Sequence, residues 1–92
     1  MKSRRSPAFR SQLKKLPTEV QSQAANAYRA FQVDPWSGDL TFKRIQGEKD
    51  VWSVRVSAQH RAVGRWRGDE MVWFFIGTHA EYDATLARLR RR

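Results

Sequence analysis

Hydrophobic positions in the first third of the chain recur at helical spacing. They predict one helix over residues 7–16 and a second helix that begins at Thr18. Pro17 separates the two, and Asp34-Pro35 ends the second, because a residue before proline avoids helical backbone. The turn between the helices is so short that they should pair as a hairpin. The apolar positions of this pattern are Phe9, Leu13, Leu16, Val20, Ala24, Ala27, Tyr28 and Phe31.

The second half of the chain changes to the period of two that is typical of β-strands. Short turns join the expected strands, so consecutive strands should pair in antiparallel fashion. A last helical turn or two is expected within residues 81–89. The strands are predicted over residues 40–45, 51–56, 60–67 and 71–76.

This order of elements predicts an α+β fold in one domain that spans residues 1–92. An N-terminal α-hairpin should pack on an antiparallel sheet of three to four strands, with a short C-terminal helical segment. The helices should cover one sheet face and leave the opposite face for function. The apolar run over residues 71–76 is typical of a central strand covered on both faces. We expect four side chains of the sheet to be largely buried: Trp52, Val54, Phe74 and Ile76.

The charge of the chain is strongly positive. It has 18 Lys and Arg against 9 Asp and Glu, which gives a formal net charge of +9. Such a charge favours RNA, DNA, an acidic membrane or an acidic protein as a partner, although a solvated basic surface without a ligand is the plainer alternative. Basic runs lie at both ends of the chain, where they are expected to be frayed and solvated. These runs include Lys2, Arg4, Arg5, Arg10, Arg88, Arg90, Arg91 and Arg92.

The sequence also argues against several classes of protein. It contains no cysteine, so disulfides and cysteine-based metal sites are excluded. No apolar run approaches the roughly 20 residues needed to cross a bilayer, so a cytoplasmic protein without a membrane partner is expected. The carboxylates are scattered, and no phosphate-binding glycine loop or nucleophile elbow is present. We therefore expect neither a metal site nor a cofactor.

The two histidines occupy different positions. His60 begins an expected strand after a polar turn, where a surface side chain without a function is the usual outcome. His79 follows the apolar strand over residues 71–76 and then Gly77-Thr78. A strand end is rigid on one side and open on the other, and histidine commonly transfers protons near neutral pH. His79 is therefore a candidate acid or base, with the capping of the strand end as its structural alternative.

Cations are numerous on the predicted strands. Strand alternation places Lys43 and Arg44 on opposite faces, and Arg61 and Arg65 on a shared face. One group should line a basic sheet surface that contacts the phosphates of a nucleic acid. Partly exposed Trp and Phe side chains could stack on bases, although most should belong to the core. The residues predicted to bind RNA are Arg44, Arg55 and Arg65.

The chain carries an ordered set of segments that resembles the RelE/ParE superfamily of toxins. The resemblance covers about residues 9–86 and rests on the order of the segments, because no single motif is highly specific. The segments are Leu16-Pro17-Thr18-Glu19-Val20, Asp34-Pro35, Leu40-Thr41-Phe42-Lys43, Trp52-Ser53-Val54-Arg55-Val56, His60-Arg61-Ala62-Val63-Gly64 and Phe75-Ile76-Gly77-Thr78-His79-Ala80-Glu81-Tyr82-Asp83.

The resemblance implies an activity. RelE-like members of the superfamily are toxins of type II toxin–antitoxin systems, and they cut mRNA on the ribosome without a metal. A base helps the 2′-oxygen attack the adjacent phosphate, cations stabilise the developing charge, and an acid assists the leaving 5′-oxygen. By resemblance, His79 is the acid or base, Arg61 is the phosphate clamp, and Lys43 and Tyr82 are supporting catalytic residues. A cognate antitoxin is also implied, and the charge of this chain predicts an acidic one.

One departure from the family pattern bears on activity. Several relatives carry an arginine on the final strand, where this chain has Phe74 and Phe75. A cation from another strand would have to substitute. The main alternative is the ParE-like branch, which shares the fold but inhibits DNA gyrase without cutting RNA. Its members do not need a histidine at the strand end, so His79 favours the nuclease. An inactive RNA-binding relative is a third possibility.

Overall fold

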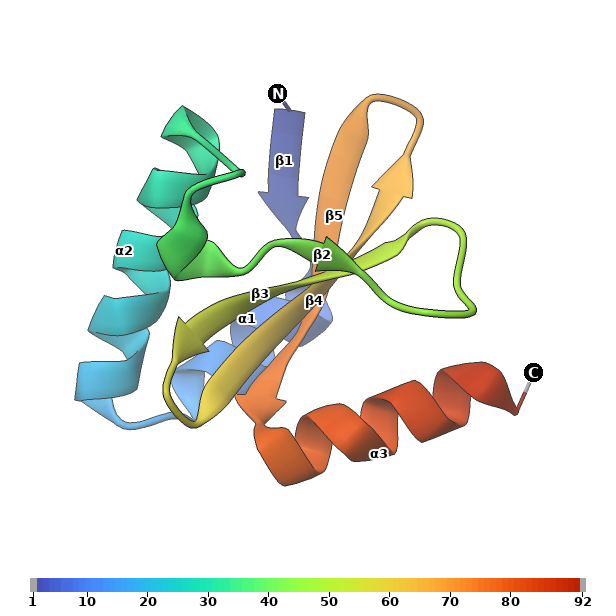
Figure 1. Ribbon diagram of the computed structural model, residues 1–92. Helices are drawn as coiled ribbons and strands as arrows, with labels where there is room; N and C mark the ends of the chain where they lie inside the picture. Colours follow the sequence, from blue (N-terminus) through green and yellow to red (C-terminus); the bar gives the residue numbers. More distant parts are fainter. Residues whose placement is uncertain (1, 92) are drawn as a thin grey trace.

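The computed structural model describes residues 2–91, so Arg92 of the C-terminal basic run lies outside the described residues. Within these residues the chain forms three α-helices, a short 3₁₀ helix and five strands (Figure 1). The predicted α+β fold is confirmed, with more strands than the three to four expected. In chain order the elements are β1 (Lys2–Arg5), α1 (Pro7–Lys14), α2 (Thr18–Val33), the 3₁₀ helix η1 (Gly38–Leu40), β2 (Lys43–Arg44), β3 (Val51–Ser57), β4 (His60–Arg67), β5 (Glu70–Thr78) and α3 (His79–Arg90).

The five strands form one sheet in the order β1-β5-β4-β3-β2. Strands β2 to β5 pair antiparallel in sequence order, as their short connections predicted. The apolar run over residues 71–76 predicted a central strand covered on both faces, and β5 is such an inner strand, with Trp73 buried on one face and Phe75 on the other. β5 lies between β4 and β1, and β1 pairs with it in parallel.

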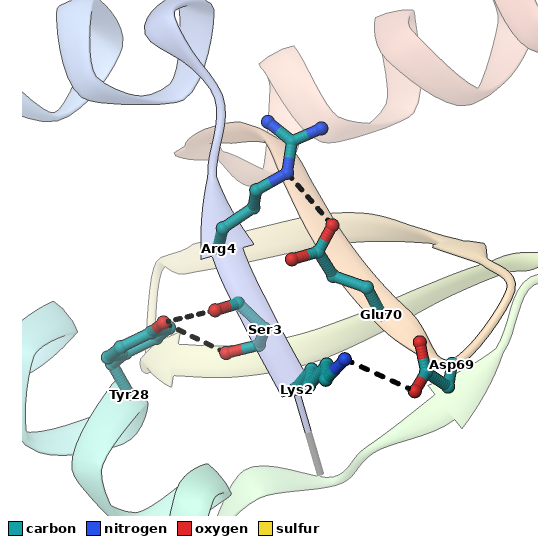
Figure 2. A network of polar contacts seen from close by, with 6 residues as sticks. All are labelled: Lys2, Ser3, Arg4, Tyr28, Asp69 and Glu70. Atoms are coloured by element: carbon teal, nitrogen blue, oxygen red, sulfur yellow. Dashed lines mark hydrogen bonds and ion pairs between the residues drawn. The ribbon is translucent and has the colours of Figure 1, made fainter.

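The N-terminal basic run was expected to be frayed, but this expectation was wrong, because residues Lys2–Arg5 form strand β1. Backbone pairing along Glu70–Trp73 holds it at the sheet edge, and a few side chains pin it (Figure 2). Lys2 forms an ion pair with Asp69 at 3.6 Å, and the Nε of Arg4 donates to Glu70 at 3.0 Å. The Ser3 hydroxyl donates to the Tyr28 hydroxyl at 2.9 Å, which ties β1 to α2. None of these contacts requires apolar and polar residues to alternate, so the hydrophobic pattern of the sequence could not predict this strand.

Helices α1 and α2 cover one face of the sheet, and the larger part of the core lies beneath them. Phe31 of α2 lies near its centre, with edge-on ring contacts to Phe42 at 5.0 Å and to Trp73 at 5.2 Å. The Trp73 ring lies close to the backbone of β4, where a Cβ at Gly64 would approach ring atom Cε3 to 2.8 Å. Glycine is therefore required at residue 64 for this packing.

The opposite sheet face is partly covered by α3, which corrects the expectation that this face would be free. A smaller buried cluster lies there and consists of Ile45, Val51, Val63 and Phe75. Tyr82, Leu86 and Leu89 of α3 and Phe74 pack against it. The helix spans 12 residues, more than the turn or two expected. Its sequence is rich in Ala and Arg and contains few large apolar residues, so the helical periodicity of its hydrophobic positions is weak.

Two further expectations about the strands were wrong. Residues 40–45 form only the two-residue strand β2, because η1 precedes it and Thr41 adopts left-handed backbone with φ 46°. Val54 and Ile76 are buried as expected, whereas Trp52 and Phe74 are half-buried. A register shift between Val63 and Gly64 leaves Phe74 without a partner on β4. Within residues 2–91, no helix is both long and apolar enough to cross a membrane.

Candidate functional site

His79 is the first residue of α3, and a local hydrogen-bond arrangement fixes its position. The Thr78 hydroxyl accepts from the backbone N–H of Glu81 at 3.3 Å, and the Glu81 carboxylate accepts from the backbone N–H of Thr78 at 2.8 Å. This capping box joins the end of β5 directly to α3 without a loop. The imidazole is exposed, and its ring centroid lies 6.4 Å from that of Tyr82 in an edge-on arrangement.

Arg61 of β4 reaches the same helix from the sheet. Its guanidinium lies over the Tyr82 ring, 5.4 Å from the centroid, so Tyr82 neighbours both Arg61 and His79. One terminal nitrogen of Arg61 donates to the Ser53 hydroxyl at 3.4 Å, while its Nε–H is buried and finds no partner among residues 2–91. A buried donor without a partner is disfavoured, and such groups often occur where a protein binds a ligand or ion.

Gly77 links Arg61 to the capping box. It is the partner of Arg61 across the β4–β5 pair, and it is buried beneath α3. A Cβ at this position would lie 2.6 Å from the Glu81 carboxylate oxygen, which caps the helix, and 2.9 Å from the Phe75 ring. A side chain at residue 77 would therefore displace the start of α3 and, with it, His79.

The other predicted cations are divided between the two faces and the edge of the sheet. Lys43 is paired with Ser53, so it lies on the face of Arg61 at the sheet edge. Arg44 is paired with Trp52 and faces the opposite side, so it does not join the other cations. Arg55 is opposite Arg61 in register, yet its exposed side chain borders a hollow with Leu40 at the sheet edge. The structure thus gathers Lys43, Arg61 and Arg65 on the α3 face and leaves Arg55 at the rim.

Arg65 lies beside the part of β5 where several relatives carry an arginine and this chain has Phe74 and Phe75. Its guanidinium lies 5.4 Å from the ring centroid of Phe74, one of the two residues that stand in place of a cation on β5. A cation from the neighbouring strand is thus brought to this part of the sheet. Within residues 2–91, neither Arg61 nor Arg65 is in an ion pair.

Some candidate groups lie elsewhere, and one residue of the site escaped sequence analysis. The Nδ1 of His60 is within hydrogen-bond distance of the Ser57 hydroxyl at 3.0 Å, and His60 borders a hollow with Val20 and Gln23 of α2. Ser53 alternates with the apolar residues of β3, a pattern typical of a solvent-facing position, but it is fully buried beside Arg61. No group of three metal-binding side chains occurs among the residues that the structure describes.

Comparison with known proteins places this chain in a family of toxins. Solved structures share the fold at low sequence identity, and no curated protein sequence matches the chain. A chain of the RelB–RelE antitoxin–toxin complex from Methanococcus jannaschii superposes with a TM-score of 0.71 at 17% identity, over 87% of this chain and 95% of that one. A chain of the RelBE2 toxin–antitoxin complex from Mycobacterium tuberculosis gives 0.68 at 18% identity, over 85% and 96%.

A third structure adds a toxin of the same fold. The YoeB/ParE toxin from Agrobacterium tumefaciens superposes with a TM-score of 0.66 at 18% identity, over 86% of this chain and 99% of that one. Residues 18–84 match the profile of the ParE-like toxin domain, and this segment spans α2 to the first half of α3. The chain therefore belongs to the ParE-like toxin domain family, within the RelE/ParE superfamily of toxins.

Proposed function

We propose that this toxin of a toxin–antitoxin system is an endoribonuclease that cuts mRNA bound to the ribosome. The observation that carries the proposal is the grouping of Arg61, Tyr82 and His79 at the junction of β5 and α3, on the face that also holds Arg65 and Lys43. A phosphate clamp, a proton-transfer group and further cations are the parts that metal-independent RNA cleavage needs.

The proposed reaction uses the RNA's own 2′-hydroxyl as nucleophile. Its proton passes to a base as the 2′-oxygen attacks the adjacent phosphorus, and the 5′-oxygen of the next nucleotide leaves with a proton from an acid. The products are a 2′,3′-cyclic phosphate and a 5′-hydroxyl end. His79 takes part in this proton transfer, since the capping box fixes its backbone at the start of α3 and its imidazole is exposed to solvent.

The cations stabilise charge that develops on the phosphate. Arg61 holds the phosphate through its guanidinium N–H groups, and the Tyr82 ring supports that guanidinium through a cation–π contact. Arg65, held over Phe74, and Lys43 at the sheet edge contact neighbouring phosphates. Arg55 extends this surface at the rim, whereas Arg44 faces away and is no longer part of the proposed RNA surface.

An acidic antitoxin is the proposed protein partner. Two of the structurally similar proteins described above were solved as antitoxin–toxin complexes, and the net charge of +9 favours an acidic segment as the neutralising element. Such a segment would cover cations of the α3 face and prevent RNA from reaching Arg61.

A second candidate function is inhibition of DNA gyrase without RNA cleavage. The matching profile is that of the ParE-like toxin domain, and Phe74 and Phe75 occupy strand positions where several relatives carry an arginine. In this alternative the cations of the α3 face would serve binding alone.

Two parallel assays of the purified toxin separate these functions. One follows mRNA cleavage in a translation extract, and the other follows DNA supercoiling by purified gyrase. We expect cleaved mRNA and unchanged supercoiling. Loss of supercoiling with intact mRNA would assign the toxin to the gyrase inhibitors, and RNA binding with neither effect would make it an inactive relative.

A further inference from the structure

A cleft outside the proposed RNA site lies between α1 and α3, beside the last residues of β5. It has a volume of about 400 Å³, and α1 and α3 flank this end of β5 (Figure 1). Phe75 and Ile76 form an apolar floor, with Leu16 and Ala84 at the sides. The polar lining comes from Gln12, Lys15, Glu81, Thr85 and Arg88.

The cleft exists because β1 stops short of it. β1 pairs with β5 only along Glu70–Trp73, so the outer edge of β5 beyond Trp73 has no neighbouring strand. Side chains accept the hydrogen bonds of the backbone N–H groups along this edge instead. The Gln12 amide oxygen accepts from the backbone N–H of Ile76 at 2.9 Å, and Glu81 accepts from that of Thr78. Because these edge donors are already used, a guest molecule would be recognised through side chains rather than as an added strand.

Two cations border the cleft from opposite walls. Lys15 comes from the end of α1 and Arg88 from α3, and neither is in an ion pair within residues 2–91. Arg88 donates to the hydroxyl of Thr85 at 3.2 Å, and Thr85 is only 5% exposed. In the described part of the chain this hydroxyl accepts from Arg88 and donates to no group, so its proton is available to an acceptor. The one acid of the cleft, Glu81, is engaged in capping α3.

We propose that this cleft binds an acidic protein segment that places a carboxylate between Lys15 and Arg88 and an apolar side chain over Phe75 and Ile76. Charge-assisted bonds from two cations and a hydroxyl suit a carboxylate, and the apolar floor suits an aliphatic neighbour. The proposal adds a second contact for the acidic antitoxin proposed above, apart from the cations of the α3 face, and it rests on that part of the proposed function. Occupation of the cleft would contact α3 beside the capping box that positions His79.

The test measures binding of a fluorescein-labelled peptide of alternating Glu and Leu by fluorescence anisotropy. Lys15→Glu and Arg88→Glu are each expected to weaken binding about tenfold or more, because each removes a charge-assisted bond and adds repulsion. The matched controls are Lys14→Glu and Arg90→Glu, which change the net charge equally on the same two helices but do not line the cleft. Circular dichroism checks folding, and Lys15→Gln with Arg88→Gln replace any reversal that does not fold.

Equal weakening by all four variants, or by none, would overturn the proposal, since it would mean diffuse attraction or another site. A labelled uridine oligonucleotide is titrated in parallel. If Lys15 and Arg88 variants weakened the oligonucleotide and left the peptide unaffected, the cleft would be a nucleic-acid site and the proposal would be wrong. The peptide measurement contains no RNA cleavage step, so its failure and the failure of the nuclease proposal are separate results.

Discussion

The two faces of the sheet differ in what covers them. On one face, α1 and α2 bury a continuous core in which Phe31 and Trp73 are almost fully enclosed. On the other, α3 buries only a small cluster around Val63 and Phe75, and its first turn stands next to Arg61. The first face therefore carries most of the stability of the fold. The second face has enough packing to fix a few polar side chains and enough open surface to present them to a ligand.

The largest effect expected from this comparison concerns stability. Phe31→Ala should lower the free energy of unfolding by about 3–5 kcal/mol, because it leaves a cavity beside Phe42 and Trp73. Tyr82→Ala on the other face should cost clearly less, since Tyr82 is only half-buried. Urea unfolding of the two variants measures the difference. Similar losses for both would mean that the α3 face carries as much stability as the α1 and α2 face.

The next prediction concerns the charges of the two faces. If RNA lies on the α3 face, Arg61→Gln should reduce the slope of log affinity against log salt by about 0.7, the value for one phosphate on a single strand. Arg44→Gln removes the same charge from the opposite face of the sheet and should leave the slope nearly unchanged. Titrations of a single-stranded RNA at several salt concentrations give both slopes. An equal change for the two variants would show that the faces attract RNA alike.

The smallest expected effect concerns the sheet edge beside the two faces. Arg4→Ala removes an exposed ion pair with Glu70, and such pairs contribute about 0.2–1 kcal/mol. Thermal unfolding should therefore change little, because the backbone pairing of β1 with β5 remains. A loss of several kcal/mol would show that the side chains in Figure 2, rather than the backbone, hold β1 in place.

Much of the fold could be predicted from periodicity, because burial on one face imposes it. The helix starts at Pro7 and Thr18 and the bounds of β4 agree with the sequence pattern. β1 could not be predicted, because a four-residue strand held by backbone bonds and exposed ion pairs leaves no apolar alternation. The length of α3 was underestimated for a similar reason, since few apolar residues mark its buried side.

The candidate site shows the same limit. Alternation correctly separated Lys43 from Arg44 and placed Arg61 with Arg65. It could not show that α3 would fold back over the face with Arg61, or that Ser53 would be buried there. Those facts depend on contacts between distant parts of the chain, and the alternation of residues along a strand does not predict such contacts.

The most direct test of this account is the rate of mRNA cleavage by the His79→Ala toxin. General acid–base catalysis is typically worth about 10²–10⁴-fold in rate, so the variant should lose activity by that factor. It should remain folded, because His79 is exposed and the capping box uses Thr78 and Glu81. His60→Ala is the control, since His60 contacts Ser57 and borders α2 instead. A large loss confined to His79→Ala is the predicted result, and undiminished cleavage by that variant would contradict the account.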